Sequence, residues 1–138
     1  GAAMTGNLTF GANNNAFFGA GSDLQIYHSG SASFIDDVGT GNLNLRADTA
    51  IAFQNSTGTE EFARFISNGA VQLNYDDSTK LATTSTGVAV TGEVDFGDWT
   101  VVESGGVLYF KHSGTNKMKL DASGNLTVTG NVTAYGSV

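Results

Sequence analysis

Cysteine and proline are both absent from this chain of 138 residues. Without cysteine, the chain can form neither a disulfide framework nor a thiolate metal site. Without proline, every backbone N–H group can donate a hydrogen bond, which suits strands that are paired on both edges. No run of apolar residues is long enough to cross a membrane, and we therefore expect no membrane insertion.

Basic residues are scarce. Six Lys and Arg stand against thirteen Asp and Glu, which gives a formal net charge of −7. Nucleic-acid binding requires a basic surface that neutralises phosphates. Basic residues cluster only at Lys111, Lys117 and Lys119, a pattern that is typical of solvated strand positions. The composition therefore predicts no nucleic-acid partner.

The residues that the chain does contain indicate an all-β fold. It has 19 Gly, nine Phe, four Tyr and one Trp, and 40% of its residues are hydrophobic. This is too apolar for a disordered linker, yet long helix-forming runs are few. In residues 59–66, Phe62, Phe65 and Ile66 have helical spacing. Because Phe62, Arg64 and Ile66 also alternate with other residues, we predict a short strand there.

The sequence repeats imperfectly along its length. Related motifs occupy residues 24–30 with 41–45, 71–77 with 87–92, and 108–114 with 124–128, and residues 6–10 resemble the end of a further unit. The units run roughly from 4 to 23, 24 to 68, 69 to 105 and 106 to 138. Residues 1–3 precede Met4 and have the character of a cloning remnant. We therefore expect one segment of repeated structure over residues 4–138.

Each unit consists of short strands with one apolar face. Apolar residues alternate with others at Leu24/Ile26, Leu43/Leu45, Val71/Leu73/Tyr75, Val88/Val90, Leu108/Phe110 and Leu126/Val128. Sequences rich in Gly, Ser, Asn and Asp separate them at 29–31, 76–79, 113–116 and 123–125, where they predict tight turns.

Such a unit cannot close a core alone. The units either stack as a solenoid or are completed by identical chains. We favour three-fold interleaving, because it turns the apolar faces inward and pairs the strand edges. The predicted fold is an elongated, repetitive all-β fibre, an intertwined or triple β-helix that is completed in a homotrimer.

The sequence resembles the shafts of tailed-bacteriophage tail fibres, especially the repetitive fibre and tail structural proteins of marine phages. Residues 17–30, 39–45, 80–88 and 128–132 carry the resemblance, and their order makes it more specific than any single motif. The resemblance covers almost the whole chain. It implies an extracellular, structural virion protein without enzymatic activity or cofactors. Its implied partners are two further copies, other virion tail proteins, and a glycan or protein of the host surface.

In fibres of this kind, a closing segment, here residues 124–138, commonly precedes an intramolecular chaperone that cleaves itself off. The chain ends near the point where that cut would fall, and it carries none of the chaperone's catalytic residues. The resemblance therefore implies a rigid rod that positions or forms the host-attachment end. The alternative is a glycan- or receptor-binding module of a fibre tip or of a bacterial surface adhesin stalk. A third class, a polysaccharide-degrading enzyme, would need a cleft lined by two acids.

Four residues are the candidates for binding. His28 and His112 occupy equivalent places, each before Ser-Gly, and three copies of either on a three-fold axis could hold a metal or an anion. We favour the simpler interpretation, a histidine beside a turn. Trp99 and Tyr109, with Phe96 and Phe110 near them in sequence, could stack on the sugars of a receptor. For Trp99, a packing role is the simpler interpretation.

Two pairs of acids, Asp36-Asp37 and Asp76-Asp77, could bind Ca²⁺ or act as a glycosidase pair. No ligand loop of the EF-hand type accompanies them, and nothing indicates a raised pKa. We therefore favour a role in turns and predict no catalytic, cofactor-binding or firmly assigned metal residues.

Overall fold

The computed structural model describes Gly6, residues 9–11 and residues 14–133. The expected remnant at residues 1–3 and the expected cleavage point near Val138 lie outside these described residues, as do residues 7 and 8 of the first repeat motif. Within the described part every regular element is a strand, and no helix is present that could span a membrane. The predicted all-β fold is confirmed.

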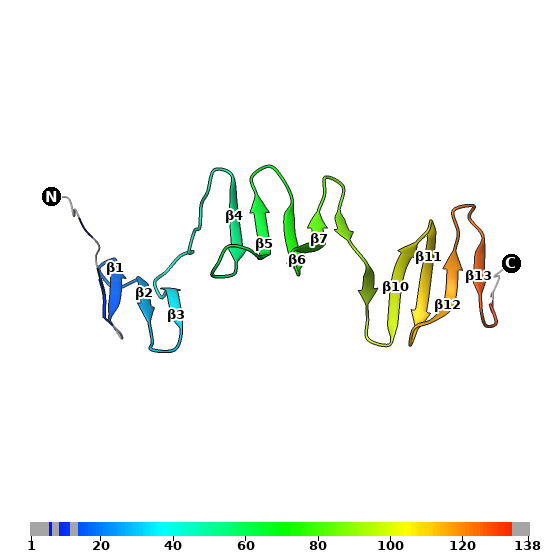
Figure 1. Cartoon of the computed structure of the whole chain (residues 1–138), viewed down its shortest axis with the longest axis horizontal. Helices are drawn as coiled ribbons and strands as arrows, with labels where there is room; N and C mark the ends of the chain where they lie inside the picture. The colour runs from blue at the N-terminus through cyan, green and yellow to red at the C-terminus, as the bar shows by residue number, and fades with distance from the viewer. Residues whose placement is uncertain (1–5, 7–8, 12–13, 134–138) are drawn as a thin grey trace. The chain divides into compact units, whose positions relative to one another are not determined.

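The strands form three antiparallel sheets, in which each strand pairs with its neighbours in the sequence, as Figure 1 shows. The first sheet contains β1 (Asn15–Phe18), β2 (Leu24–His28) and β3 (Ser33–Asp37). The second contains β4 (Ala50–Gln54), β5 (Glu61–Ile66), β6 (Val71–Tyr75), β7 (Ser78–Thr83) and β8 (Val88–Val90). The third contains β9 (Glu93–Asp95), β10 (Trp99–Ser104), β11 (Val107–His112), β12 (Thr115–Leu120) and β13 (Leu126–Val128). None of the three sheets closes on itself.

The chain divides into two compact units, residues 1–46 with the first sheet and residues 47–138 with the other two. The sheets group the strands differently from the repeat units of the sequence, because each five-stranded sheet begins before its repeated hairpin and ends after it. The repeat units remain a description of the sequence.

Two local predictions have opposite outcomes. Residues 59–66 were ambiguous between helix and strand, and β5 confirms the strand. The strand predicted at Leu43 and Leu45 is wrong for the single chain, since both residues lie in irregular structure between β3 and β4. The equivalent segments β8 and β13 are strands because β7 and β12 lie beside them. Within the described residues, no such neighbour pairs with Leu43 or Leu45.

The second and third sheets repeat the same backbone design. In both, a two-residue turn joins the central hairpin, at Asp76-Asp77 and at Ser113-Gly114. All four turn residues have positive φ, between 48° and 75°, as a type I′ turn requires. The register then shifts by one residue just after Leu73 and just after Phe110. The sequence repeat is therefore a repeat of a hairpin together with its bulge.

The same bulge is closed by the same hydrogen bond in both sheets. The amide of Thr91 donates to the carbonyl oxygen of Lys80 at 2.9 Å, and the amide of Thr129 donates to that of Lys117 at 3.0 Å. Lys80 and Lys117 are the extra residues of the two bulges. Because a bulge fixes the register of its hairpin, it determines which residues share a face on β7, β8, β12 and β13.

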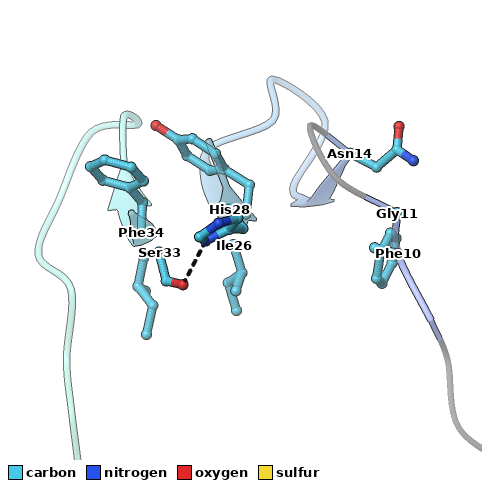
Figure 2. A pocket seen from close by; sticks show the side chains of 9 residues that line it. Phe10, Gly11, Asn14, Ile26, His28, Ser33 and Phe34 are labelled. Atoms are coloured by element: carbon cyan, nitrogen blue, oxygen red, sulfur yellow. Dashed lines mark hydrogen bonds between the residues drawn. The ribbon is translucent and has the colours of Figure 1, made fainter. Parts of the chain in front are cut away.

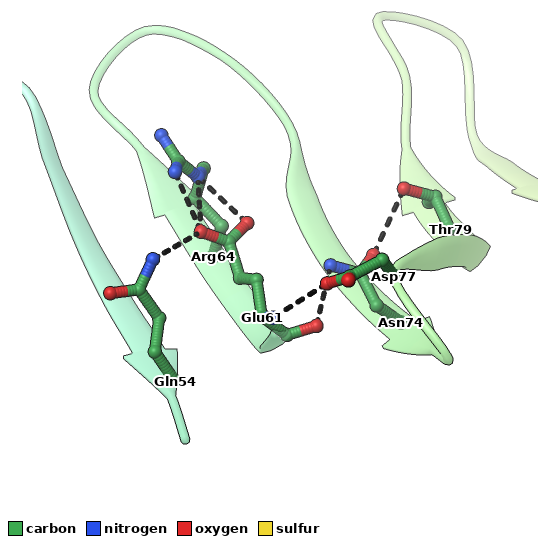
Figure 3. A network of polar contacts seen from close by, with 6 residues as sticks. All are labelled: Gln54, Glu61, Arg64, Asn74, Asp77 and Thr79. Atoms are coloured by element: carbon green, nitrogen blue, oxygen red, sulfur yellow. Dashed lines mark hydrogen bonds and ion pairs between the residues drawn. The ribbon is translucent and has the colours of Figure 1, made fainter. Parts of the chain in front are cut away.

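A third bulge lies in β5, and polar side chains of the neighbouring β6–β7 hairpin satisfy its backbone (Figure 3). The amide of Glu61 donates to Oδ1 of Asp77 at 2.8 Å, and its carbonyl oxygen accepts a bond from Nδ2 of Asn74 at 3.0 Å. Thr79 holds Asn74 in turn, through a bond of 2.9 Å to Oδ1. The side chain of Glu61 pairs with Arg64 at 2.6 Å, and this ion pair lowers the pKa of Glu61.

We expect Asp77→Ala to lower the free energy of unfolding by about 1–2 kcal/mol, because it removes the acceptor of the Glu61 amide and places Ala at positive φ. Asp77→Asn keeps an acceptor oxygen and tolerates the left-handed conformation, so its effect should be less than half as large. Urea unfolding at one fixed protein concentration measures both. Equal losses for the two variants would show that the side-chain bond to Glu61 contributes nothing.

Candidate functional site: an uncovered apolar face

Strand pairing collects the apolar residues of each five-stranded sheet on one face. Residues that pair directly lie on the same side of a sheet, so one continuous row crosses all five strands. In the second sheet the row is Phe53, Ala63, Leu73, Leu81 and Val90. In the third it is Val94, Val101, Phe110, Met118 and Val128. We call these the apolar rows and the surfaces that carry them the apolar faces.

Further apolar residues widen both faces. Ile51, Phe65, Val71 and Val88 lie beside the row of the second sheet, and Leu108, Leu120 and Leu126 lie beside that of the third. The opposite faces carry the rows Ala52–Arg64–Gln72–Ala82–Ala89 and Glu93–Val102–Tyr109–Lys119–Thr127. We call these the polar faces. Each sheet is therefore amphipathic, as the alternation in the sequence predicts.

Within the described part of the chain, no layer covers the apolar faces. None of its side chains, polar or apolar, is buried. Leu73 is 46% exposed and Leu126 is 60% exposed. Exposed apolar rows that run across all five strands of a sheet are more than a soluble monomer normally leaves uncovered.

The first sheet exposes apolar residues on both of its faces, since Phe17 and Phe34 lie on the face opposite to Ile26. Ala16, Ile26 and Ile35 form one row across its three strands. Ile26 is 43% exposed and Ile35 is 56% exposed. A hollow of about 570 Å³ is lined by Phe10, Gly11, Asn14, Ile26, Tyr27, His28, Ser33, Phe34 and Ile35. Figure 2 shows these side chains around an open space, with Phe10 apart from the hairpin.

The two histidines occupy equivalent places in the structure as they do in the sequence. His28 ends β2 and His112 ends β11, each at a hairpin turn and each opposite a hydroxyl residue, Ser33 or Thr115. The Nδ1 atom of His28 lies 3.1 Å from the Ser33 hydroxyl. No group of three metal-ligating side chains occurs within the described residues of one chain. Binding by three copies on an axis stays a prediction.

The structure separates the two aromatic candidates. Trp99 pairs with His112. It is two residues from Val101 on the same strand and therefore lies on the apolar face of the third sheet. Its ring is tilted against the His112 ring at a centroid distance of 5.0 Å. Tyr109 pairs with Val102 and Lys119 on the polar face. The two rings therefore belong to different surfaces and cannot form one receptor site within a single chain.

The turn predicted at Asp36-Asp37 is wrong, because both residues lie in β3, where they pair with Gln25 and Leu24 of β2. Asp36 accepts a hydrogen bond of 2.9 Å from the Tyr27 hydroxyl, which raises the pKa of Tyr27. Asp76 and Asp77 form the β6–β7 turn. Asp121 accepts backbone bonds from Asn125 and Ser123, and these lower its pKa. A general acid needs a raised pKa, and the lowered value of Asp121 suits a carboxylate that holds a turn.

Comparisons with known proteins add no relative: no family model, no curated protein and no solved structure matches this chain. The geometry of the sheets therefore carries the functional argument. The sequence analysis did not predict two features of these sheets. One is the bulge network around Glu61. The other is the row Tyr109–Lys119–Thr127, which a comparison of the third repeat with the second at alternate positions could have found.

Proposed function

We propose that this chain is a segment of a homotrimeric fibre of the bacteriophage tail-fibre type, which holds or forms the host-contacting end of the tail. The observation that carries the proposal is the uncovered apolar face of each five-stranded sheet. A chain with no buried side chain in its described part lacks the hydrophobic burial that offsets chain entropy. It needs a partner in order to be stable.

Further copies of the same chain are the partner that fits best. Apolar rows that stay exposed across whole five-stranded sheets are typical of obligate, interwoven complexes, whose interfaces are larger and more hydrophobic than a standard interface. The edge strands β4, β8, β9 and β13 each have one unpaired side. Other copies can pair with these edges while their apolar faces cover one another. Cyclic symmetry with three chains closes such an arrangement around an axis and leaves no apolar face uncovered.

A mechanical role follows from this kind of assembly. In an interleaved trimer no chain can leave without breaking strand pairs and exposing all of its apolar faces. Such a fibre resists unfolding and proteolysis because the barrier to opening is high. These properties suit a rod that transmits position and force outside the cell, and they require no catalytic group. The resemblance of the sequence to phage fibre shafts supports the same function.

Sedimentation velocity combined with electron microscopy tests this proposal. The purified protein should sediment as a trimer with a frictional ratio well above that of a globular protein. Gold-labelled antibodies against it should decorate the tails of the virions that carry it. A globular particle, or label confined to bacterial cells, would contradict the phage-fibre proposal.

A further inference from the structure

The third sheet carries a hollow that is lined mostly by residues of its polar face. It measures about 250 Å³ and is lined by Tyr109, Asn116, Lys117, Met118, Lys119, Thr127 and Thr129. Tyr109, Lys119 and Thr127 stand side by side in one row across β11, β12 and β13. Every lining residue comes from these three strands and from the residue that follows β13.

The second sheet provides a comparison within the same chain. Its equivalent row is Gln72, Ala82 and Ala89, on a backbone with the same hairpin turn and the same bulge. Two of these three residues are alanine, so this backbone forms without large side chains at those two positions. The apolar rows of the two sheets are, by contrast, similar in character. The replacement of Gln, Ala and Ala by Tyr, Lys and Thr on an exposed surface therefore calls for a reason other than folding.

Charge concentrates at the same place. The chain has six basic residues, and two of them, Lys117 and Lys119, line the hollow. Lys111 is neutralised by Glu93 at 2.9 Å. Among the described residues, no carboxylate lies within ion-pair distance of Lys117 or Lys119. Nearby Asp121 uses both of its carboxylate oxygens in its own turn.

We propose that this hollow binds an acidic saccharide, a sugar ring that carries a carboxylate or sulfate group. The ring of Tyr109 offers a rigid apolar surface for the flat face of a sugar. Lys119 and Lys117 supply positive charge for the acidic group. The amide of Asn116 and the hydroxyl of Thr127 can bond to sugar hydroxyls. This proposal depends on the proposed fibre in one respect. The polar face must stay open when other copies of the chain cover the apolar faces.

Isothermal titration with three probes tests the site: tetragalacturonate, a sulfated chondroitin tetrasaccharide and neutral maltotetraose. We expect one or both acidic probes to bind, and the neutral probe to bind at least about tenfold more weakly, because it cannot pair with the lysines. Lys119→Gln and Tyr109→Ala should each weaken binding by about tenfold. The matched control is Lys80→Gln, which changes the equivalent bulge of the second sheet and should leave binding unchanged.

The two acidic probes show whether a carboxylate or a sulfate is recognised. Equal binding of maltotetraose, binding of neither acidic probe, or binding that survives both Lys119→Gln and Tyr109→Ala would each overturn the site. Light scattering on the same samples separates this result from the fibre proposal. A trimer that binds neither probe loses the site and keeps the fibre, whereas a monomer that binds keeps the site and loses the fibre. Lys119 is exposed, so Lys119→Gln should leave the fold intact. Weaker binding by this variant therefore reports on the site and not on unfolding.

Discussion

Leu73→Asp is expected to stop the chain from assembling. Leu73 is the central residue of the apolar row of the second sheet, between Ala63 and Leu81. If other copies cover this face, the substitution buries one unpaired carboxylate per chain, and a buried unpaired charge costs several kcal/mol. In a symmetric trimer the cost occurs three times, once in each chain. The mass in solution should fall to that of one chain, or the protein should precipitate.

The matched control is Gln72→Asp, one residue away on the same strand. Gln72 lies on the polar face, next to Arg64. There an added carboxylate remains hydrated and has a positive partner, so assembly should be unaffected. Multi-angle light scattering after size exclusion measures both variants. If Leu73→Asp assembled as the unchanged protein does, the apolar row would not be an interface.

Trp99 is expected to report the covered face directly, because it is the only tryptophan. In the single chain its side chain is 47% exposed, on the apolar face. Covering by other copies should shift its emission to shorter wavelength. It should also lower the acrylamide quenching constant several-fold relative to the chain unfolded in urea, since acrylamide must reach the ring.

Phe110→Asp, in the row beside Trp99, is the control for this measurement. It should disrupt the interface of the third sheet and raise the quenching constant toward the unfolded value. The polar-face change Lys119→Gln should leave the constant as it is. Quenching of the unchanged, folded protein that equalled quenching of the unfolded chain would contradict the account, because Trp99 would then face solvent.

The sequence predicts strands and turns correctly where residues close together in the chain determine them. Alternation at Val71, Leu73 and Tyr75 gives the apolar side of β6, and Asp76-Asp77 is the kind of dipeptide that a type I′ turn accepts. The strand within residues 59–66 is harder to predict, because Phe62 is the extra residue of a bulge. A bulge breaks the two-residue period and brings apolar residues to helix-like spacing.

The sequence shows which residues alternate in polarity, but it does not show which strands pair. Leu43 and Leu45 alternate as well as Leu126 and Val128 do, yet only the latter pair with a neighbouring strand in the single chain. Periodicity describes which side of a strand is apolar, and pairing depends on whether another strand lies beside it. A partner chain can supply such a neighbouring strand. The sequence of one chain does not show whether it does.

The placement of the site residues depended on register. The sequence does not show that Trp99 and Tyr109 lie on different faces, because this depends on which residues of β10 and β11 pair across the Ser104–Val107 hairpin. That register places Trp99 opposite His112 and Tyr109 opposite Val102, on opposite faces. A one-residue slip would have exchanged the two faces of a strand. Turn length and bulges therefore decide a functional assignment that composition leaves open.

The absolute mass of the protein in solution tests the central claim, that copies of this chain cover its apolar faces. Size exclusion with light scattering should give three times the chain mass of 14.2 kDa, and the same species should persist in unheated SDS electrophoresis because strand interleaving slows dissociation. A folded species of a single chain mass would contradict the claim, since its exposed apolar rows would then be compatible with a stable monomer.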